Sequence, residues 1–161
     1  MKTYYLRNWF VLLYFAVLSC TVSCSKNDSA EDIEKREALT IKENIFQLVN
    51  AHRAVIGKEP LATNYLASQL AEEHTRYMIT QNDISHDNFD DRADRLFDEE
   101  NAKSVGENVA AKQRSAKDVM EAWLNSTGHR ENIEGDFTHI GISAVKNDVG
   151  QYYYTQLFLK Q

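Results

Sequence analysis

The chain has only two cysteines in 161 residues, and both, Cys20 and Cys24, lie near its N-terminus. The rest of the chain therefore contains no disulfide and must be held together by its hydrophobic core, for which about 120 residues are enough. The local metal patterns HExxH and CxxC are absent as well. Internal repeats and low-complexity segments are lacking, so the sequence predicts one folded domain.

The chain has fewer basic than acidic residues. The sequence has 18 Lys and Arg against 24 Asp and Glu, which gives a formal net charge of −6. Removing residues 1–23 takes away Lys2 and Arg7 but no acid, so the charge of the remaining chain becomes −8. This acidic balance argues against a nucleic-acid partner and against charge-driven docking on anionic lipid.

The N-terminus has the order of an export signal. Lys2 and Arg7 precede an apolar run over residues 9–22, and a small residue, Ser19 or Ser23, stands directly before each cysteine. The run is too short for a confident membrane span. We therefore predict a signal peptide over residues 1–23.

The two cysteines allow two interpretations. A disulfide is unfavourable because only three residues separate them. "VLSC" and "TVSC" each resemble the acylation motif of bacterial lipoproteins, and we favour Cys24 over the alternative Cys20 because the polar run "SKNDSAEDIEKRE" follows it directly. That run resembles the surface-display segment of lipoproteins from Bacteroidetes-type bacteria. We predict an acylated cysteine and flexible tether over residues 24–38, with the membrane as a partner and the Gram-negative cell envelope or its outer surface as the location.

Hydrophobic periodicity predicts four helices in the remaining chain, at about residues 38–56, 63–81, 90–97 and 115–126. Ser115 with Asp118 three residues later is typical of a helix start, and Thr63 or Asn64 is expected to cap the second helix. His52 and His74 fall on apolar stripes. We expect both to be structural, with His52 hydrogen-bonded to a backbone carbonyl.

The C-terminus changes to the period of a strand. Residues 139–145 and 151–160 flank the turn-rich "KNDVG" and predict an antiparallel hairpin. Both faces of the last strand carry bulky and mostly apolar side chains. Since a sheet with one wet face would alternate more cleanly, we expect helices on both sides.

Three chemically capable residues lie near predicted element boundaries: His86 in "ISHDNF", Glu107 in "SVGENVA" and His129 in "AWLNSTGHRENI". Sites are often built on loops held by a rigid scaffold. Gly128 is expected to take a positive φ that ends the fourth helix and turns His129 toward the other two. Arg130 is expected to form an ion pair or to hold carbonyls at the rim, and Trp123 to lie in the core.

Six motifs in order carry a family resemblance: "LVNAHRAVIGKEPL", "ISHDNF…RL", "GENVA", "AWLNSTGHRENI", "FTHIGISA" and "YYYTQLF". Together they resemble the bacterial branch of the CAP domain family, the SCP-like extracellular domain also found in cysteine-rich secretory and plant pathogenesis-related proteins. The match extends over about residues 41–160, and the CAP-like domain is placed at residues 39–161.

The resemblance implies an α+β fold, an α-β-α sandwich with a three-stranded antiparallel sheet between helices. It also implies a cleft with two histidines and acids, to which His86, Glu107 and His129 correspond by motif. The family commonly has a second glutamate three residues after the tryptophan of the fourth helix. Here that cleft position is Ser126, so a complete acid–base set is in doubt.

Three functions follow from this resemblance. A secreted binding module would hold a divalent cation such as Zn²⁺ at His86, His129 and Glu107, and a lipid or peptide ligand nearby. A metal-assisted hydrolase would use Glu107 as the general base, or Ser126 as a nucleophile near His129. A structural or adhesive surface domain would retain the cleft without using it. The fold alone does not choose among them.

Overall fold

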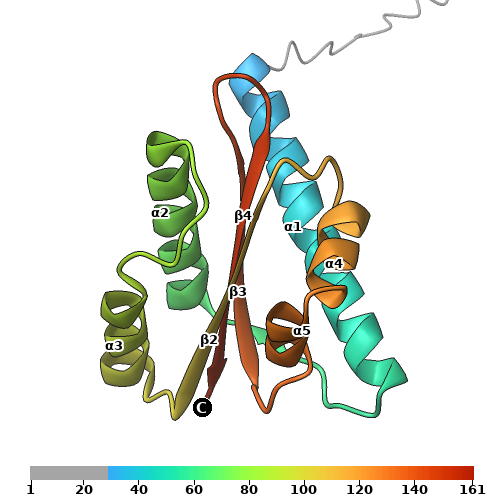
Figure 1. The fold of residues 1–161 in the computed structure, drawn as a ribbon, viewed down its shortest axis with the longest axis vertical. Helices are drawn as coiled ribbons and strands as arrows, with labels where there is room; N and C mark the ends of the chain where they lie inside the picture. The colour runs from blue at the N-terminus through green and yellow to red at the C-terminus, as the bar shows by residue number, and fades with distance from the viewer. Residues whose placement is uncertain (1–28) are drawn as a thin grey trace, which may run out of the picture.

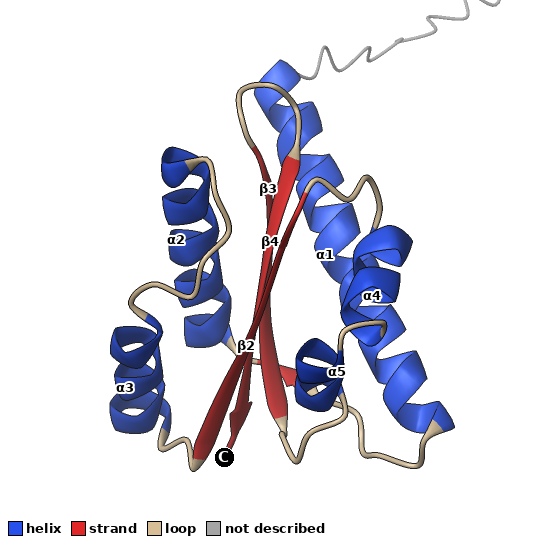
Figure 2. Ribbon diagram, in the orientation of Figure 1, coloured by secondary structure: helices blue, strands red, loops and turns tan. Residues whose placement is uncertain are grey.

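The computed structural model describes residues 29–161, so the predicted signal peptide, Cys20 and Cys24 lie outside the described residues. Within these residues, five helices enclose a four-stranded sheet in three layers (Figure 1, Figure 2). The predicted α+β sandwich is confirmed, with one strand more than expected. No helix in this part of the chain has the apolar length needed to cross a bilayer.

The sheet has the strand order β1-β3-β4-β2. The predicted hairpin is confirmed as β3 (His139–Lys146) and β4 (Tyr152–Lys160). The strand β2 (Ser104–Ala111) pairs antiparallel with β4 and forms one edge of the sheet. At the other edge β1 (Ala62–Thr63) pairs parallel with β3. Its two residues are too few to show an alternating pattern in the sequence.

Helices cover both faces of the sheet, as predicted. The helices α2 (Tyr65–Gln81) and α3 (Phe89–Glu100) lie on one side, and α1 (Ala30–Val55), α4 (Ala116–Leu124) and α5 (Thr127–Ile133) lie on the other (Figure 1). Every residue of β4 except the last is therefore buried.

The first helix begins earlier than predicted. We expected a tether up to residue 38, but α1 starts at Ala30, so residues 30–38 are helical. Ser29 and Asp32 form a capping box that starts it, with the Ser29 hydroxyl accepting from the Asp32 amide at 3.1 Å. The first turns of α1 are exposed and lack the apolar stripe on which the prediction depended.

The other predicted caps are confirmed. The Asn64 side chain accepts from the Ala67 amide at 2.8 Å, and the Ser115 hydroxyl accepts from the Asp118 amide at 3.1 Å. Trp123 is a core residue, as predicted: it is 1% exposed and donates from Nε1 to the Val109 carbonyl at 3.2 Å.

Candidate functional site

Glu107 is the centre of the candidate site. We expected it near an element boundary, but it lies in the middle of β2, and its side chain is 2% exposed. Because side chains alternate along a strand, Glu107 points to the side of α2 and α3, and its neighbours Gly106 and Asn108 point to the side of α5. The rigid sheet therefore fixes the carboxylate.

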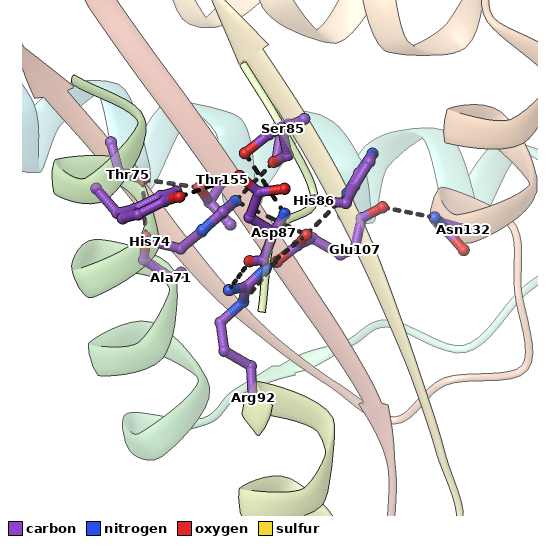
Figure 3. Close-up of polar contacts among 12 residues, drawn as sticks. Ala71, His74, Thr75, Ser85, His86, Asp87, Arg92, Glu107, Asn132 and Thr155 are labelled. Atoms are coloured by element: carbon purple, nitrogen blue, oxygen red, sulfur yellow. Dashed lines mark hydrogen bonds and ion pairs between the residues drawn. The ribbon is translucent and has the colours of Figure 1, made fainter. Parts of the chain in front are cut away.

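Arg92 of α3 holds this carboxylate. Its Nε donates to Glu107 Oε2 at 2.8 Å and its Nη2 donates to Oε1 at 2.9 Å, in a bidentate arrangement (Figure 3). The Arg92 side chain is 8% exposed, so both charges are removed from water and each needs the other. Sequence reasoning missed Arg92, because an arginine in a short charged helix usually faces solvent.

His86 lies against the same carboxylate. Its Nδ1 is 2.8 Å from Glu107 Oε1, and the imidazole is half-exposed. A carboxylate only accepts hydrogen bonds, so Nδ1 is the donor and carries the proton. In the neutral ring, Nε2 then keeps its lone pair for another partner.

Two side chains, those of His74 and Arg92, hold the backbone on both sides of His86. His74 of α2 donates from Nε2 to the Ser85 carbonyl at 2.7 Å, and Arg92 donates from Nη1 to the Asp87 carbonyl at 2.7 Å (Figure 3). The expected structural role of His74 is confirmed, and its ring also lies 3.9 Å from Glu107 Oε1. Burial lowers the pKa of His74, with Glu107 opposing the shift.

The segment that carries His129 differs from the prediction. The fourth helix ends at Leu124, and Thr127–Ile133 forms a separate helix, α5. Gly128 lies inside α5 without a positive φ, so the expected turn at Thr127-Gly128 is wrong. The break comes at Ser126, which has the extended conformation of a helix N-cap.

Two asparagines attach α5 to β2. Asn108 donates from Nδ2 to the His129 carbonyl at 3.0 Å. Asn132 donates from Nδ2 to the Glu107 carbonyl, also at 3.0 Å (Figure 3). Gly106 makes this approach possible, because a Cβ there would lie 2.8 Å from Asn132 Oδ1. These contacts place His129 on the side of β2 opposite to the Glu107 carboxylate. Spacing in the sequence gave no signal for the asparagine pair.

His129 is partly buried, and its pKa is lowered, first by burial and then by the positive charge of a protonated His86. The two imidazoles are therefore near enough for their charges to repel each other. They reach the edge strand β2 from its two sides, His86 from the connection before α3 and His129 from α5. Burial therefore favours the neutral form of the His129 ring.

The remaining predicted residues have minor roles. Within residues 29–161, no hydrogen bond joins the Ser126 hydroxyl to His86, Glu107 or His129. Arg130 donates from Nη1 to the Leu124 carbonyl at 2.9 Å, which confirms the expected contact with a carbonyl. His52 pairs with the Glu134 carboxylate at 2.8 Å rather than with a backbone carbonyl, so its predicted partner is wrong.

If this site held a cation, the two imidazoles would be its donors. Both Glu107 oxygens are already engaged by Arg92, and one also accepts from His86. In the described part of the chain, no group of three or more His, Cys, Asp or Glu side chains could hold a metal ion. Beside His86 lies a pocket of about 350 Å³ whose lining includes Asp90 and Asp91, so its charge attracts cations.

Comparison with known proteins shows what this chain is similar to. A sequence model of the cysteine-rich secretory protein (CAP) family matches residues 46–158. The Bacillus subtilis protein YkwD is 32% identical over 112 residues, which cover 66% of this chain and 43% of YkwD.

Solved structures show the same fold. An extracellular protein with an SCP domain from Bacillus anthracis superposes with a TM-score of 0.71 at 27% identity, over 83% of this chain and 45% of that protein. An outer surface protein of Borrelia burgdorferi superposes with a TM-score of 0.67 at 21% identity, over 74% of this chain and 94% of that one.

This chain spans less than half the length of YkwD and of the Bacillus anthracis protein. The family match nevertheless covers most of it, including His86, Glu107 and His129. The chain belongs to the cysteine-rich secretory protein (CAP) family.

Proposed function

We propose that this protein is an extracellular, membrane-anchored binding module that holds a divalent cation between His86 and His129. The supporting observation is the 2.8 Å hydrogen bond from His86 Nδ1 to Glu107, which fixes the ring and leaves the Nε2 lone pair for a ligand. The lowered pKa of His129 keeps the second imidazole neutral, as coordination requires.

The donor chemistry favours a late first-row cation such as Zn²⁺ over Mg²⁺ or Ca²⁺. Two protein ligands leave coordination positions for solvent or for an oxygen of a lipid or peptide ligand, which the cation would polarise. In this proposal Glu107 does not bind the cation but acts on its ligand His86. It orients the His86 ring instead of binding the cation, because Arg92 engages both oxygens of the carboxylate.

Hydrolysis is a second candidate, supported by the same hydrogen bond. Glu107 is a poor general base here, since Arg92 and His86 take its oxygens. The base would instead be His86, whose Nε2 could accept a proton from water while Glu107 holds the ring. An adhesive or structural domain would need neither role, and an inert site in the metal test would favour it.

The proposed location combines two observations. The chain begins with the features of an export signal and two acylation-like motifs. The Bacillus anthracis relative is described as extracellular and the Borrelia burgdorferi protein as an outer surface protein. We therefore place this domain outside the cytoplasm, anchored by acyl chains on Cys24.

Calorimetric titration with Zn²⁺ tests the cation site. Binding should be tighter above pH 6.5 than below it, because protonated imidazoles do not coordinate. Saturating Zn²⁺ should raise the melting temperature by stabilising the native state. His86→Ala and His129→Ala should each abolish that increase, while His52→Ala, which removes a histidine bonded to Glu134 outside the site, should keep it. Binding that survives loss of both His86 and His129 would contradict the proposal.

Intact-mass analysis of the protein purified from membranes tests the anchor. The mature chain should begin at Cys24 and carry acyl chains, each buried methylene adding about 0.8 kcal/mol to membrane affinity. A soluble chain that begins at Ser25 or later without a lipid adduct would contradict the anchor, whereas a start at Cys20 would change only its position.

A further inference from the structure

A second pocket lies apart from the imidazole site. It has a volume of about 990 Å³ and lies between the first half of α1, the connection from β2 to α4 and the hairpin of β3 and β4. Ile33, Ile41 and Tyr152 line it with apolar groups. The cation proposed above does not use any residue of this pocket.

The charge of the pocket is opposite to that of the chain. Four of its five charged lining residues are basic, Arg36, Lys112, Arg114 and Lys146, against the single acid Glu37. The whole chain, in contrast, has a net charge of −6. Among residues 29–161, Glu37 pairs with Lys146 at 2.5 Å, and no ion pair engages Lys112 or Arg114. Both side chains are exposed, so the positive charges of Lys112 and Arg114 are available to bind an anion.

Lys112 has an unusual backbone. Its φ is 80°, and the other non-glycine residues with positive φ within residues 29–161 are all asparagines. Asparagine and glycine adopt this conformation more easily than lysine. The connection is nevertheless fixed, because the Lys112 amide donates to the Tyr152 carbonyl at 2.7 Å and the Tyr154 hydroxyl donates to the Gln113 carbonyl at 2.8 Å. A cationic side chain is thus kept at a position that favours asparagine or glycine, which points to a use for the charge.

The pocket lies at the end of the molecule where α1 begins. The tip of the β3–β4 hairpin stands beside the first turns of α1 (Figure 1), and the Lys146–Glu37 pair joins the two. Val149 at this tip is 78% exposed and Ile33 is 47% exposed. Cys24 precedes Ala30 by six residues, which span at most about 20 Å. If Cys24 is acylated as proposed above, this end is held close to the bilayer.

We propose that this end docks on the membrane, with Lys112 and Arg114 binding the phosphates of anionic phospholipid headgroups and Val149 entering the headgroup layer. Basic residues near an anionic surface gain attraction that acts within a Debye length. Lys112 and Arg114 therefore have to outweigh the acids Glu34 and Asp148, which lie at the same end of the molecule. The closeness of the bilayer rests on the proposed acylation, whereas the chemistry of the pocket does not.

A fluorescent label at the hairpin tip tests the docking. The acylated full chain carrying Val149→Cys is labelled with a polarity-sensitive dye and placed in nanodiscs of phosphatidylcholine, with or without an equimolar share of phosphatidylglycerol. With Cys24 acylated, the new thiol is the only free one in the mature chain. The emission should shift to the blue on the anionic discs, and added salt should reverse the shift.

Charge variants identify the residues responsible. Lys112→Gln with Arg114→Gln should remove most of the shift, while the matched pair Lys58→Gln with Lys103→Gln, which removes the same charge outside the pocket, should keep it. Lys112→Gly should also reduce the shift while raising the melting temperature, because it relieves the positive φ. A purely structural Lys112 would leave the shift unchanged.

Two results with the discs would overturn the proposal: an equal blue shift on both kinds of disc, or a full shift in the double variant Lys112→Gln with Arg114→Gln. Loss of the shift on adding inorganic phosphate at constant ionic strength would also overturn it, because the pocket would then bind free phosphate. If mass analysis shows no acylation, the labelled protein is added to vesicles of the same two compositions from solution. A blue shift there supports docking without the anchor, so the two proposals fail separately.

Discussion

The two faces of the sheet are filled by different means. Under α1, α4 and α5, one large apolar cluster includes Trp123, Tyr154 and Phe158. Under α2 and α3, two smaller apolar clusters share the face with buried polar groups. There the Glu107–Arg92 pair, His74 and a hydrogen bond of 2.8 Å between Thr75 and Thr155 are removed from water (Figure 3).

This difference separates stability from site geometry. Apolar burial stabilises without direction, whereas a buried ion pair needs defined partners and contributes little net stability. The α2–α3 face therefore holds Glu107 and the backbone around His86 in one arrangement. The opposite face supplies most of the hydrophobic core. It also buries Asn108 and Gln156 where β2 meets α5, and Arg53 of α1, which donates to the Ile133 carbonyl at 2.8 Å.

The largest predicted effects are losses of about 3–5 kcal/mol on either face, and they differ in whether a second substitution restores stability. Trp123→Ala leaves a cavity in the apolar cluster and should lower the free energy of unfolding by this amount. Arg92→Met should do the same by leaving the Glu107 carboxylate buried without its cation. Adding Glu107→Leu to Arg92→Met should recover most of the loss. Urea unfolding measures all three variants.

The control is Trp123→Ala combined with Glu107→Leu, in which no recovery is expected because the two side chains act on opposite faces. A loss below about 1 kcal/mol for Arg92→Met would mean that water or another group replaces the arginine. It would also mean that the α2–α3 face is less dry than its burial indicates.

The fold could be predicted where buried apolar residues recur at the spacing of a helix or a strand. The helices before Gln81 and the C-terminal hairpin were marked by apolar spacing, and β4 was identified as buried on both faces from its bulky residues. The exposed start of α1 and the two-residue β1 have no such pattern. A solvated helix is recognised in sequence only by its cap, here Ser29 with Asp32, which lies inside the polar run that we predicted to be a tether.

The site could be predicted only as a set of residue types. Motif order brought His86, Glu107 and His129 to attention, but it did not show that Arg92 takes the Glu107 carboxylate. An arginine pointing inward from a charged helix looks the same in sequence as one pointing outward. In a similar way, a sum of charge over the chain does not show that Lys112 and Arg114 line the same pocket.

A smaller effect is expected from pH. Burial lowers the pKa of His74 in the native state, while the unfolded value stays near 6.5. Below about pH 6.5 the unfolded chain thus binds more protons than the native one, and the free energy of unfolding should fall as pH decreases. His129, whose pKa is also lowered, acts in the same direction. Urea unfolding between neutral and mildly acidic pH measures the slope.

The comparison of the two faces sharpens this test. His74→Gln should lower stability at neutral pH, where the bond to Ser85 is weakened, and should reduce the slope with pH. His52→Gln removes a partly buried histidine paired with Glu134 outside the α2–α3 face, and serves as the control for replacing a histidine elsewhere in the chain. Stability that rises on acidification would contradict a buried neutral His74.

The smallest effect tests the helical start of α5. Gly128 lies inside that helix with open space for a Cβ, so Gly128→Ala should raise the free energy of unfolding by about 0.5 kcal/mol through better helix propensity. Gly57 also has open space for a Cβ, but its φ is 73°, and Gly57→Ala should lower stability by about 1 kcal/mol. Since the two sites differ mainly in backbone conformation, thermal melts of the pair isolate that factor. A loss of stability in both variants would contradict a helical backbone at Gly128. It would indicate a turn there, and α5 would then not hold His129 beside β2.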